Sequence, residues 1–219
     1  MKYKKKIRLI DFKNLKNLKL NNNSINLIDI IYDSSNIHKK NYIKDSFNTA
    51  FKIIKSGFTK KLINGPINKN EFLAKKFLGV TEYISNQFNQ KKFAMLIYNK
   101  NLSVCPITTH LPIKNISNKI TKKLIMEKVI LIDNFFKNNF GFRPKIGVTG
   151  LNPHCESIDK FNEDDKIIKP SIKNLKKKRF KINGPFPADT IFLKQNRVNY
   201  DVIIGMYHDQ VLAPLKALK

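Results

Sequence analysis

The chain has 219 residues, of which 42% are hydrophobic, so it is long enough to bury one substantial core or two small ones. This composition argues against a chain that is disordered throughout. The formal net charge of +26 suggests, by itself, nucleic acid or another anionic surface as a partner.

The charge comes mainly from lysine, because the arginines are only Arg8, Arg143, Arg179 and Arg197. Arginine reads bases and phosphates through a bidentate fork, so its scarcity weakens the nucleic-acid interpretation. The same positive field would attract a small anionic substrate. We therefore expect no nucleic-acid partner, and we keep a basic nucleic-acid-binding protein as a less favoured alternative.

The two cysteines, Cys105 and Cys155, form no disulfide framework and match no repeated Cys-pair metal spacing. A reducing cytoplasm is the simplest location for such a chain. The apolar part of the basic N-terminal stretch is too short for the core of a signal peptide. No apolar run in the sequence reaches membrane-spanning length. The sequence therefore predicts a cytoplasmic protein with no membrane partner.

The first predicted elements are a strand, a polar connection and a helix. Residues 25–32 form a short apolar run rich in β-branched residues, which is typical of a strand buried on both faces. Residues 34–42 are polar, contain His38, and are expected to be an exposed connection. Apolar residues then recur at helical spacing from Ile43 to Ile54, and Gly57 is positioned as a C-terminal stop.

Two apolar runs, 92–99 and 102–108, follow so closely that they indicate an antiparallel hairpin. A longer helix is predicted from Ile120 to Phe135, with Ser117 as its N-cap and Gly141 after its end. Further buried strands are expected at 145–150 and 200–206, and the lysine-rich residues 174–180 are read as a solvated helix end. Alternating strands and helices predict an α/β fold with a mixed, largely parallel sheet.

Three of the four histidines each follow a predicted strand: His110, His154 and His208. In open α/β sheets ligands bind outside the carboxyl ends of the strands, so these imidazoles could converge on one divalent ion. Alternatively, each histidine makes only a local hydrogen bond at its strand end. The pattern alone leaves these two interpretations equally weighted.

Two polar turns also merit attention. Residues 63–69, INGPINK, run into a helix start whose free N–H groups could hold an anion, although an ordinary strand-to-helix turn explains them equally well. Residues 183–190, NGPFPADT, form a proline-rich turn that presents Asp189. Helix capping is the favoured role of Asp189 on the sequence of this turn alone.

Six stretches occur in one order along residues 60–216: NGPINK, GVTEYI, TTHLPI, GLNPHCES, NGPFPADTIF and MYHDQVLAPLK. Together they resemble the 4-hydroxythreonine-4-phosphate dehydrogenase family of pyridoxal phosphate biosynthesis. The resemblance implies a three-layer α/β/α fold like that of isocitrate and isopropylmalate dehydrogenases, and a homodimer. It also implies that His110, His154 and His208 bind a divalent metal (Zn, Co, Mg or Mn), with ligands drawn from both subunits.

The resemblance further implies NAD-dependent oxidation and decarboxylation of 4-phosphooxy-L-threonine, a small anionic phosphorylated substrate, to 3-amino-2-oxopropyl phosphate. Substrate contacts fall on Thr81 and Lys216, whereas Val80 replaces the family's histidine. Asp189 and Asp209 are the carboxylates expected to accept a proton or to support a metal ligand. The residues that would bind NAD are not identified by the sequence.

The family's glycine-rich N-terminal segment and its C-terminal substrate and cofactor segment have no match in the sequence. We therefore expect residues 1–219 to be a partial dehydrogenase chain. A truncated, noncatalytic metal-binding dimer of the same family is the alternative.

Overall fold

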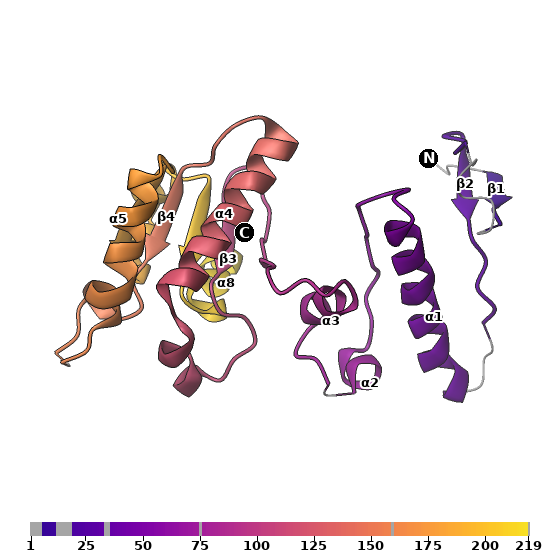
Figure 1. Cartoon of the computed structure of the whole chain (residues 1–219), viewed down its shortest axis with the longest axis horizontal. Coiled ribbons are helices and arrows are strands. Elements are labelled where there is room, and N and C mark those ends of the chain that lie inside the picture. Colours follow the sequence, from indigo (N-terminus) through magenta and orange to yellow (C-terminus); the bar gives the residue numbers. More distant parts are fainter. Residues whose placement is uncertain (1–5, 12–18, 33–35, 75, 159, 219) are drawn as a thin grey trace. The chain divides into compact units, whose positions relative to one another are not determined.

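The computed structural model describes residues 6–11, 19–32, 36–74, 76–158 and 160–218; the side chains of residues 36–40 and of Asn70 are outside the description. The chain divides into two compact units, residues 1–87 and residues 88–219 (Figure 1).

In its described residues, the first unit contains two short parallel strands and three helices. The strands are β1 (Lys6–Leu9) and β2 (Ser24–Leu27), and the helices are α1 (Asn36–Lys55), α2 (Lys69–Leu73) and α3 (Val80–Gln87). The strand expected at 25–32 is therefore present but ends at Leu27.

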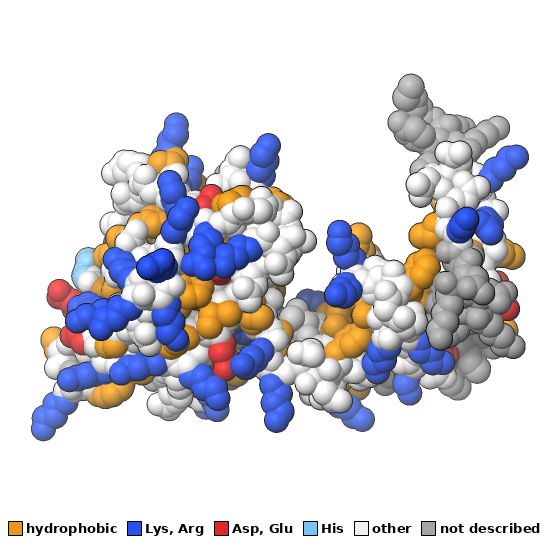
Figure 2. Space-filling view, turned by 45° about the horizontal axis from the view of Figure 1, so that its top comes forward, with side chains coloured by type: hydrophobic (Ala, Val, Ile, Leu, Met, Phe, Trp, Pro, Cys, Tyr) orange, Lys and Arg blue, Asp and Glu red, His pale blue; other side chains and the backbone are white. Residues whose placement is uncertain are grey.

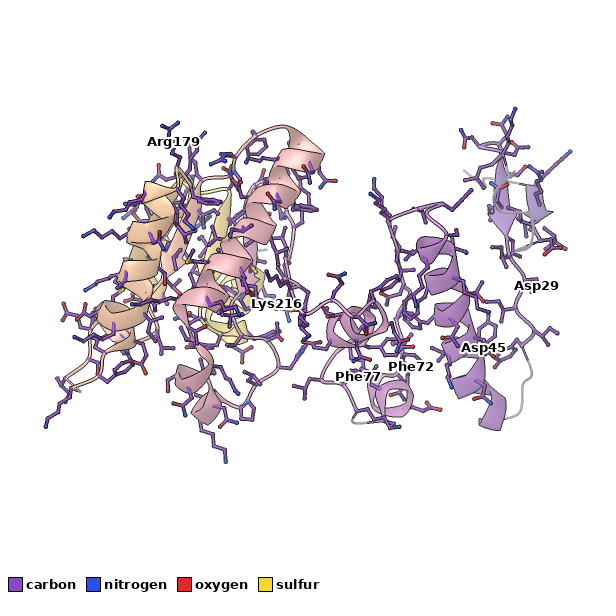
Figure 3. All side chains as sticks on the ribbon, in the orientation of Figure 1. Asp29, Asp45, Phe72, Phe77, Arg179 and Lys216 are labelled. Carbon is purple, nitrogen blue, oxygen red and sulfur yellow. The ribbon has the colours of Figure 1, made fainter. Side chains whose placement is uncertain are left out.

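Aromatic rings hold the three helices of this unit together. The Tyr83 ring of α3 lies 5.5 Å from that of Phe47 and 5.2 Å from that of Phe72, measured between centroids. Phe77 also contacts Tyr83, with 5.5 Å between their centroids; Phe72 and Phe77 are labelled in Figure 3. Edge-to-face pairs of this kind add to the stabilisation that comes from burying the rings. Burial also raises the pKa of the Tyr83 hydroxyl.

The predicted helix ending near Gly57 is confirmed. Gly57 adopts φ 82°, and its N–H donates to the carbonyl of Ile54. The prediction that residues 34–42 are an exposed connection is wrong for residues 36–42, because α1 begins at Asn36. Residues 34–35 and the His38 side chain lie outside the described part of the chain.

The second unit is built on a four-stranded parallel sheet. Its strands are β3 (Ser103–Pro106), β4 (Ile146–Thr149), β5 (Ile182–Phe186) and β6 (Val202–Gly205), in the order β3-β6-β4-β5. All three strand pairs are parallel. The strands expected within 102–108, 145–150 and 200–206 are confirmed as β3, β4 and β6.

The expected antiparallel hairpin is reduced to one bridge. Ile97 and Val104 exchange both backbone hydrogen bonds, at 2.9 and 3.1 Å, but residues 92–99 form no continuous strand. Strand β5 was not predicted, because its Gly184-Pro185 dipeptide reads as a turn; in the structure this peptide bond is cis.

Helices cover both faces of the sheet. They are α4 (Lys122–Phe140), α5 (Lys169–Lys177), α6 (Ala188–Ile191), α7 (Lys194–Arg197) and α8 (His208–Ala217). Strand residues alternate between the two faces. Cys105 and Ile204 pack in one core with α4 and α5, whereas Val104 and Ile203 pack in a second core with α6 and α8 (Figure 1). The three-layer α/β/α prediction is therefore confirmed for this unit.

Helix α4 begins later than the sequence suggested. Its N-cap is Thr121, whose hydroxyl accepts from the Leu124 N–H at 3.1 Å, whereas Ser117 opens a separate 3-10 turn. Gly141 ends the helix as predicted, with φ 76°. The lysine-rich segment 174–180 includes the end of α5, and its lysines are exposed, as expected.

Figure 2 shows Lys and Arg side chains spread over the face in view instead of gathered in one groove. Among the described helices, none is long and apolar enough to cross a bilayer.

Candidate metal and substrate site

The parallel arrangement of the sheet brings its four carboxyl ends to one edge. His110 follows β3, His154 follows β4, Asp189 follows β5 and His208 follows β6. Since the carboxyl ends of parallel strands share an edge, these predicted site residues belong to one edge of the second unit. The structure brings some pairs of these side chains close together and not others.

His110 and His208 lie close together. Their ring centroids are 5.7 Å apart, with 38° between the ring planes. Strands β3 and β6 are direct neighbours, so the segments that follow them also run side by side. The carbonyl of Gly205 accepts from the Ile107 N–H at 2.7 Å, which extends the ladder beyond the strands toward the two histidines.

Asp209 contacts His208. The Nδ1 atom of His208 lies 2.7 Å from Oδ1 of Asp209, and the two side chains are 31% and 81% exposed. A carboxylate that accepts from Nδ1–H fixes the imidazole tautomer and leaves Nε2 free to bind a metal. The position of Asp209 therefore suits the supporting role that the sequence suggested.

His154 lies in a different part of the same edge. It lines a cavity of about 300 Å³ whose walls come from the loop after β4, the start of α6 and the start of α8; the lining residues are Leu151, Asn152, Pro153, His154, Ala188, Asp189, Tyr207 and Gln210. Two of the predicted site residues, His154 and Asp189, thus share one cavity. The cavity is large enough for a small polar substrate group.

A buried carboxylate shapes the loop that carries His154. Asp164 is fully buried and accepts from the backbone N–H groups of Leu151 and Asn152, at 2.9 and 3.0 Å. It also accepts from the Asn152 side-chain amide at 3.1 Å. The backbone then turns through left-handed conformations at His154 (φ 55°) and Cys155 (φ 60°), which are unfavourable for both residue types.

The sequence did not identify Asp164 as a site residue. Its only signal was an Asp-Asp pair at 164–165 in a chain with few acidic residues. Beside it, the pKa of the Cys155 thiol is raised, first by burial and then by the negative charge of Asp164.

Asp189 does not cap its helix. The N-cap of α6 is Pro187, and Asp189 lies within the first turn. The favoured capping interpretation of the 183–190 turn is therefore wrong, and the carboxylate is available to the cavity that it lines.

The two predicted substrate residues, Thr81 and Lys216, lie on helices of different units. Thr81 lies in the first turn of α3, in the other unit. Lys216 is exposed in the last turn of α8 (Figure 3). It is eight residues after His208, so a rise of about 1.5 Å per residue separates the two by about 12 Å along the helix.

Residues 63–68 have no regular secondary structure, so no strand precedes the helix at the predicted strand-to-helix turn. The helix that follows, α2, has only five residues, and its N-cap Asn68 accepts from the Glu71 N–H at 3.4 Å.

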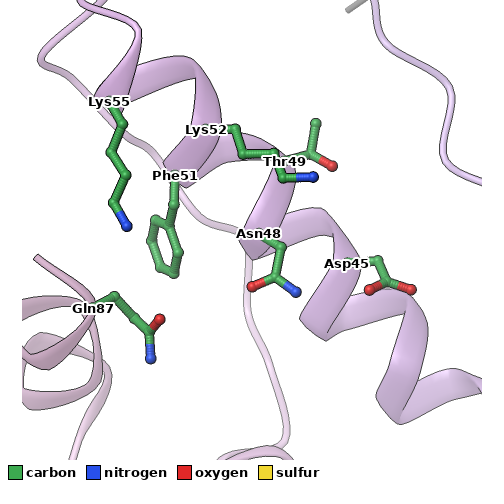
Figure 4. Close-up of a pocket in the computed structure, with 7 residues that line it drawn as sticks. All are labelled: Asp45, Asn48, Thr49, Phe51, Lys52, Lys55 and Gln87. Atoms are coloured by element: carbon green, nitrogen blue, oxygen red, sulfur yellow. The ribbon is translucent and has the colours of Figure 1, made fainter.

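The first unit contains a separate cavity of about 420 Å³, formed along α1 and also lined by Gln87 of α3 (Figure 4). Asp45, Asn48 and Lys52 line it, and no predicted site residue does.

The metal hypothesis can be tested against the donor geometry. Among the described residues of one chain, no group of three or more His, Cys, Asp and Glu side chains lies close enough to hold an ion. The 5.7 Å centroid spacing of His110 and His208 is nevertheless compatible with two ligands of one ion. Two imidazoles that bind an ion through nitrogens at about 2.0–2.1 Å have ring centroids about 5–6 Å apart.

A family model described as "Pyridoxal phosphate biosynthetic protein PdxA" matches residues 2–219. The 4-hydroxythreonine-4-phosphate dehydrogenase of Sulfurihydrogenibium sp. is 40% identical over 161 residues, which are 72% of this chain and 49% of the relative. The enzyme of the same name from Bacteroides thetaiotaomicron is 36% identical over 174 residues, covering 77% of this chain and 48% of the relative. The chain thus spans about half the length of these curated relatives.

Solved structures agree with these matches. A crystal structure of 4-hydroxythreonine-4-phosphate dehydrogenase from Klebsiella pneumoniae has a TM-score of 0.79 and 26% identity, and the match covers 97% of this chain and 68% of that one. The enzyme of the same name from Burkholderia phymatum has a TM-score of 0.73 and 29% identity, with 97% and 67% covered. The α/β fold class is confirmed by these neighbours.

Proposed function

We propose, because the chain belongs to the PdxA family of pyridoxal phosphate biosynthetic proteins, that it takes part in the dehydrogenase reaction for which its relatives are named. The proposed substrate is 4-phosphooxy-L-threonine. Its secondary alcohol loses a hydride to NAD and a proton to a base, and the resulting β-keto acid loses carbon dioxide to give 3-amino-2-oxopropyl phosphate.

The observation that carries this proposal is the juxtaposition of His110 and His208, with ring centroids 5.7 Å apart at the carboxyl ends of adjacent strands. The proposed ligands of a divalent ion are these two histidines and His154. Such an ion, when bound, lowers the pKa of an alcohol and stabilises negative charge that develops on oxygen.

The chain's own groups have distinct proposed roles. Asp209 holds the His208 ring through Nδ1, at 2.7 Å, so that Nε2 faces away from the carboxylate. Asp189 shares the cavity of His154 and is the proposed acceptor of the hydroxyl proton.

The proposed substrate contacts are Thr81, through its hydroxyl, and Lys216, through its positive charge on the phosphate or carboxylate. The proposal includes a homodimer in which the metal ligands come from both subunits. The high lysine content supports the choice of substrate, because the net charge of +26 favours the approach of an anionic molecule.

The proposal is tested by following NADH absorbance with the chain, 4-phosphooxy-L-threonine, NAD and either Zn²⁺, Co²⁺, Mg²⁺ or Mn²⁺. His154→Ala should abolish both metal retention and NADH formation, whereas His38→Ala, a change to the histidine of α1, should affect neither. Metal content that is unchanged in His154→Ala would contradict the ligand assignment. Histidine-dependent metal binding without NADH formation would instead support the noncatalytic metal-binding dimer.

A further inference from the structure

Three buried polar side chains lie at the carboxyl edge of the sheet, close to the histidines in the sequence. They are Thr108, Thr149 and Gln210, and their exposed fractions are 4%, 0% and 8%. A buried polar group is costly unless it is hydrogen-bonded, so the partners of these side chains reveal what the groups hold in place.

Gln210 connects the ends of β4 and β6. Its Oε1 accepts from the Thr149 hydroxyl at 2.8 Å and from the Met206 N–H at 2.7 Å. Its Nε2 donates to the carbonyl of Gly150 at 2.8 Å. The orientation of the amide is fixed, because a backbone N–H can only donate and a backbone carbonyl can only accept.

Thr108 continues this connection to β3. Its hydroxyl donates to the carbonyl of Met206 at 2.7 Å, and its own N–H donates to the same carbonyl at 3.1 Å. Both backbone polar groups of Met206 are therefore held. Gln210 binds the Met206 N–H, and Thr108 binds the Met206 carbonyl. The hydrogen bonds run continuously from β3 through β6 to β4, which is the order of the strands in the sheet.

Each connected position lies just before one of the three histidines in the sequence. Thr108 is two residues before His110, Met206 is two before His208, and Gly150 is four before His154. Side chains that fix these backbone positions also fix the points from which the three imidazoles project. The arrangement rests on groups that water does not reach, so it is rigid compared with the exposed loops.

We propose that Gln210, together with Thr149 and Thr108, positions His110, His154 and His208 for metal binding. This inference rests on the proposed function, because it assumes that the histidines bind an ion. Gln210 is proposed as a positioning residue, since its side-chain amide hydrogen-bonds to the backbone that precedes the histidines. Loss of partners that orient metal ligands typically weakens metal binding by about 10–100-fold.

The test measures Co²⁺ binding by the full 219-residue chain, through the dissociation constant and the visible absorption spectrum of the bound ion. Gln210→Glu keeps the acceptor and the shape but removes the donor to Gly150, and Thr149→Val removes one donor to Gln210 with little change in volume. We expect Gln210→Glu to weaken Co²⁺ binding about 10–100-fold and to alter the spectrum. Thr149→Val should change the Co²⁺ affinity and the spectrum in the same direction, but to a smaller extent.

Ser103→Ala is the matched control. Ser103 is also fully buried, and its hydroxyl donates to the Asn99 carbonyl at 3.1 Å, but it lies at the opposite, amino end of β3. This variant should lose thermal stability and keep the Co²⁺ affinity and spectrum of the wild type. If Ser103→Ala weakened Co²⁺ binding as much as Gln210→Glu does, the effect would be one of general stability and the inference would be overturned.

The remaining outcomes separate this inference from the proposed function. Failure of the wild type to bind Co²⁺, or equal binding by His208→Ala, would overturn the metal site and the inference with it. Binding that depends on His208 but is unchanged in Gln210→Glu and Thr149→Val would overturn only the positioning role. If Gln210→Glu does not fold, the Co²⁺ affinity and spectrum of Thr149→Val alone decide whether the positioning role stands.

Discussion

The carboxylate of Asp209 and the imidazole of His208 lie 2.7 Å apart, so consecutive residues at the start of α8 form a hydrogen-bonded pair. If His208 binds a metal through Nε2, Asp209 keeps its ring in the required tautomer. Asp209→Ala should then weaken Co²⁺ binding about 10-fold or more. Asp209→Asn, which retains an acceptor oxygen, should weaken it less. Isothermal titration of both variants with Co²⁺ provides the measurement, and equal affinity for wild type and Asp209→Ala would refute the role.

Asp164 and Asp165 are neighbours with opposite environments, and this difference predicts different effects on stability. Asp164→Ala removes the acceptor of two backbone N–H groups at the start of the His154 loop and should lower the free energy of unfolding by on the order of 3 kcal/mol. Asp165 is half exposed and pairs with Lys169 on the surface, where solvent screens the charges, so Asp165→Ala should lower the free energy of unfolding much less. Urea unfolding followed by circular dichroism compares the two, and similar losses would contradict the assignment of Asp164 as the loop anchor.

Burial raises the pKa of the Cys105 thiol from 9.0 to about 12, an effect that the charge of Lys128 partly opposes. Because the folded-state pKa is the higher one, the neutral thiol contributes stability that is fully present below pH 9 and is lost as the pH rises toward 12. The stability difference between wild type and Cys105→Ala should therefore shrink between pH 8 and roughly pH 11. Denaturant unfolding at several pH values measures this difference, in which the titration of lysines common to both proteins cancels. A difference independent of pH would show that the thiol ionises equally in the folded and unfolded chains.

The N-terminus of α4 offers a direct comparison between the predicted and the observed cap. Thr121→Ala removes the acceptor for the Leu124 N–H and should destabilise the chain by about 1 kcal/mol. Ser117→Ala should have little effect, because the structure assigns no capping hydrogen bond at that turn. Thermal unfolding of the two variants distinguishes them, and a larger loss for Ser117→Ala would place the cap where the sequence alone had suggested it.

The strands that carry the histidines could be predicted from sequence because they are buried on both faces. The central parts of these runs, IGV at 146–148 and VIIG at 202–205, are therefore apolar, and the position of each histidine soon after a run is visible without a structure. The residues that hold these segments together could not be predicted. Gln210 finds its partners Thr149 and Gly150 about sixty residues away, and no local pattern encodes such a pairing.

Local propensity failed at two places for different reasons. Strand β5 contains Gly184 and Pro185, which usually interrupt strands, yet β5 lies at the edge of the sheet, where a missing N–H donor is tolerated. The start of α1 is polar and was read as a connection, but a helix can begin with a polar turn before its apolar face is needed.

The order β3-β6-β4-β5 also bears on how the protein is made. Strand β6 lies between β3 and β4 in the sheet. It is also the last of the described strands to be synthesised. While the ribosome is still translating residues 107–201, β3 lacks its neighbour in the sheet, and β4 can pair only with β5. The nascent second unit therefore exposes unpaired strand edges until 202–205 emerge, and such edges favour association with other chains.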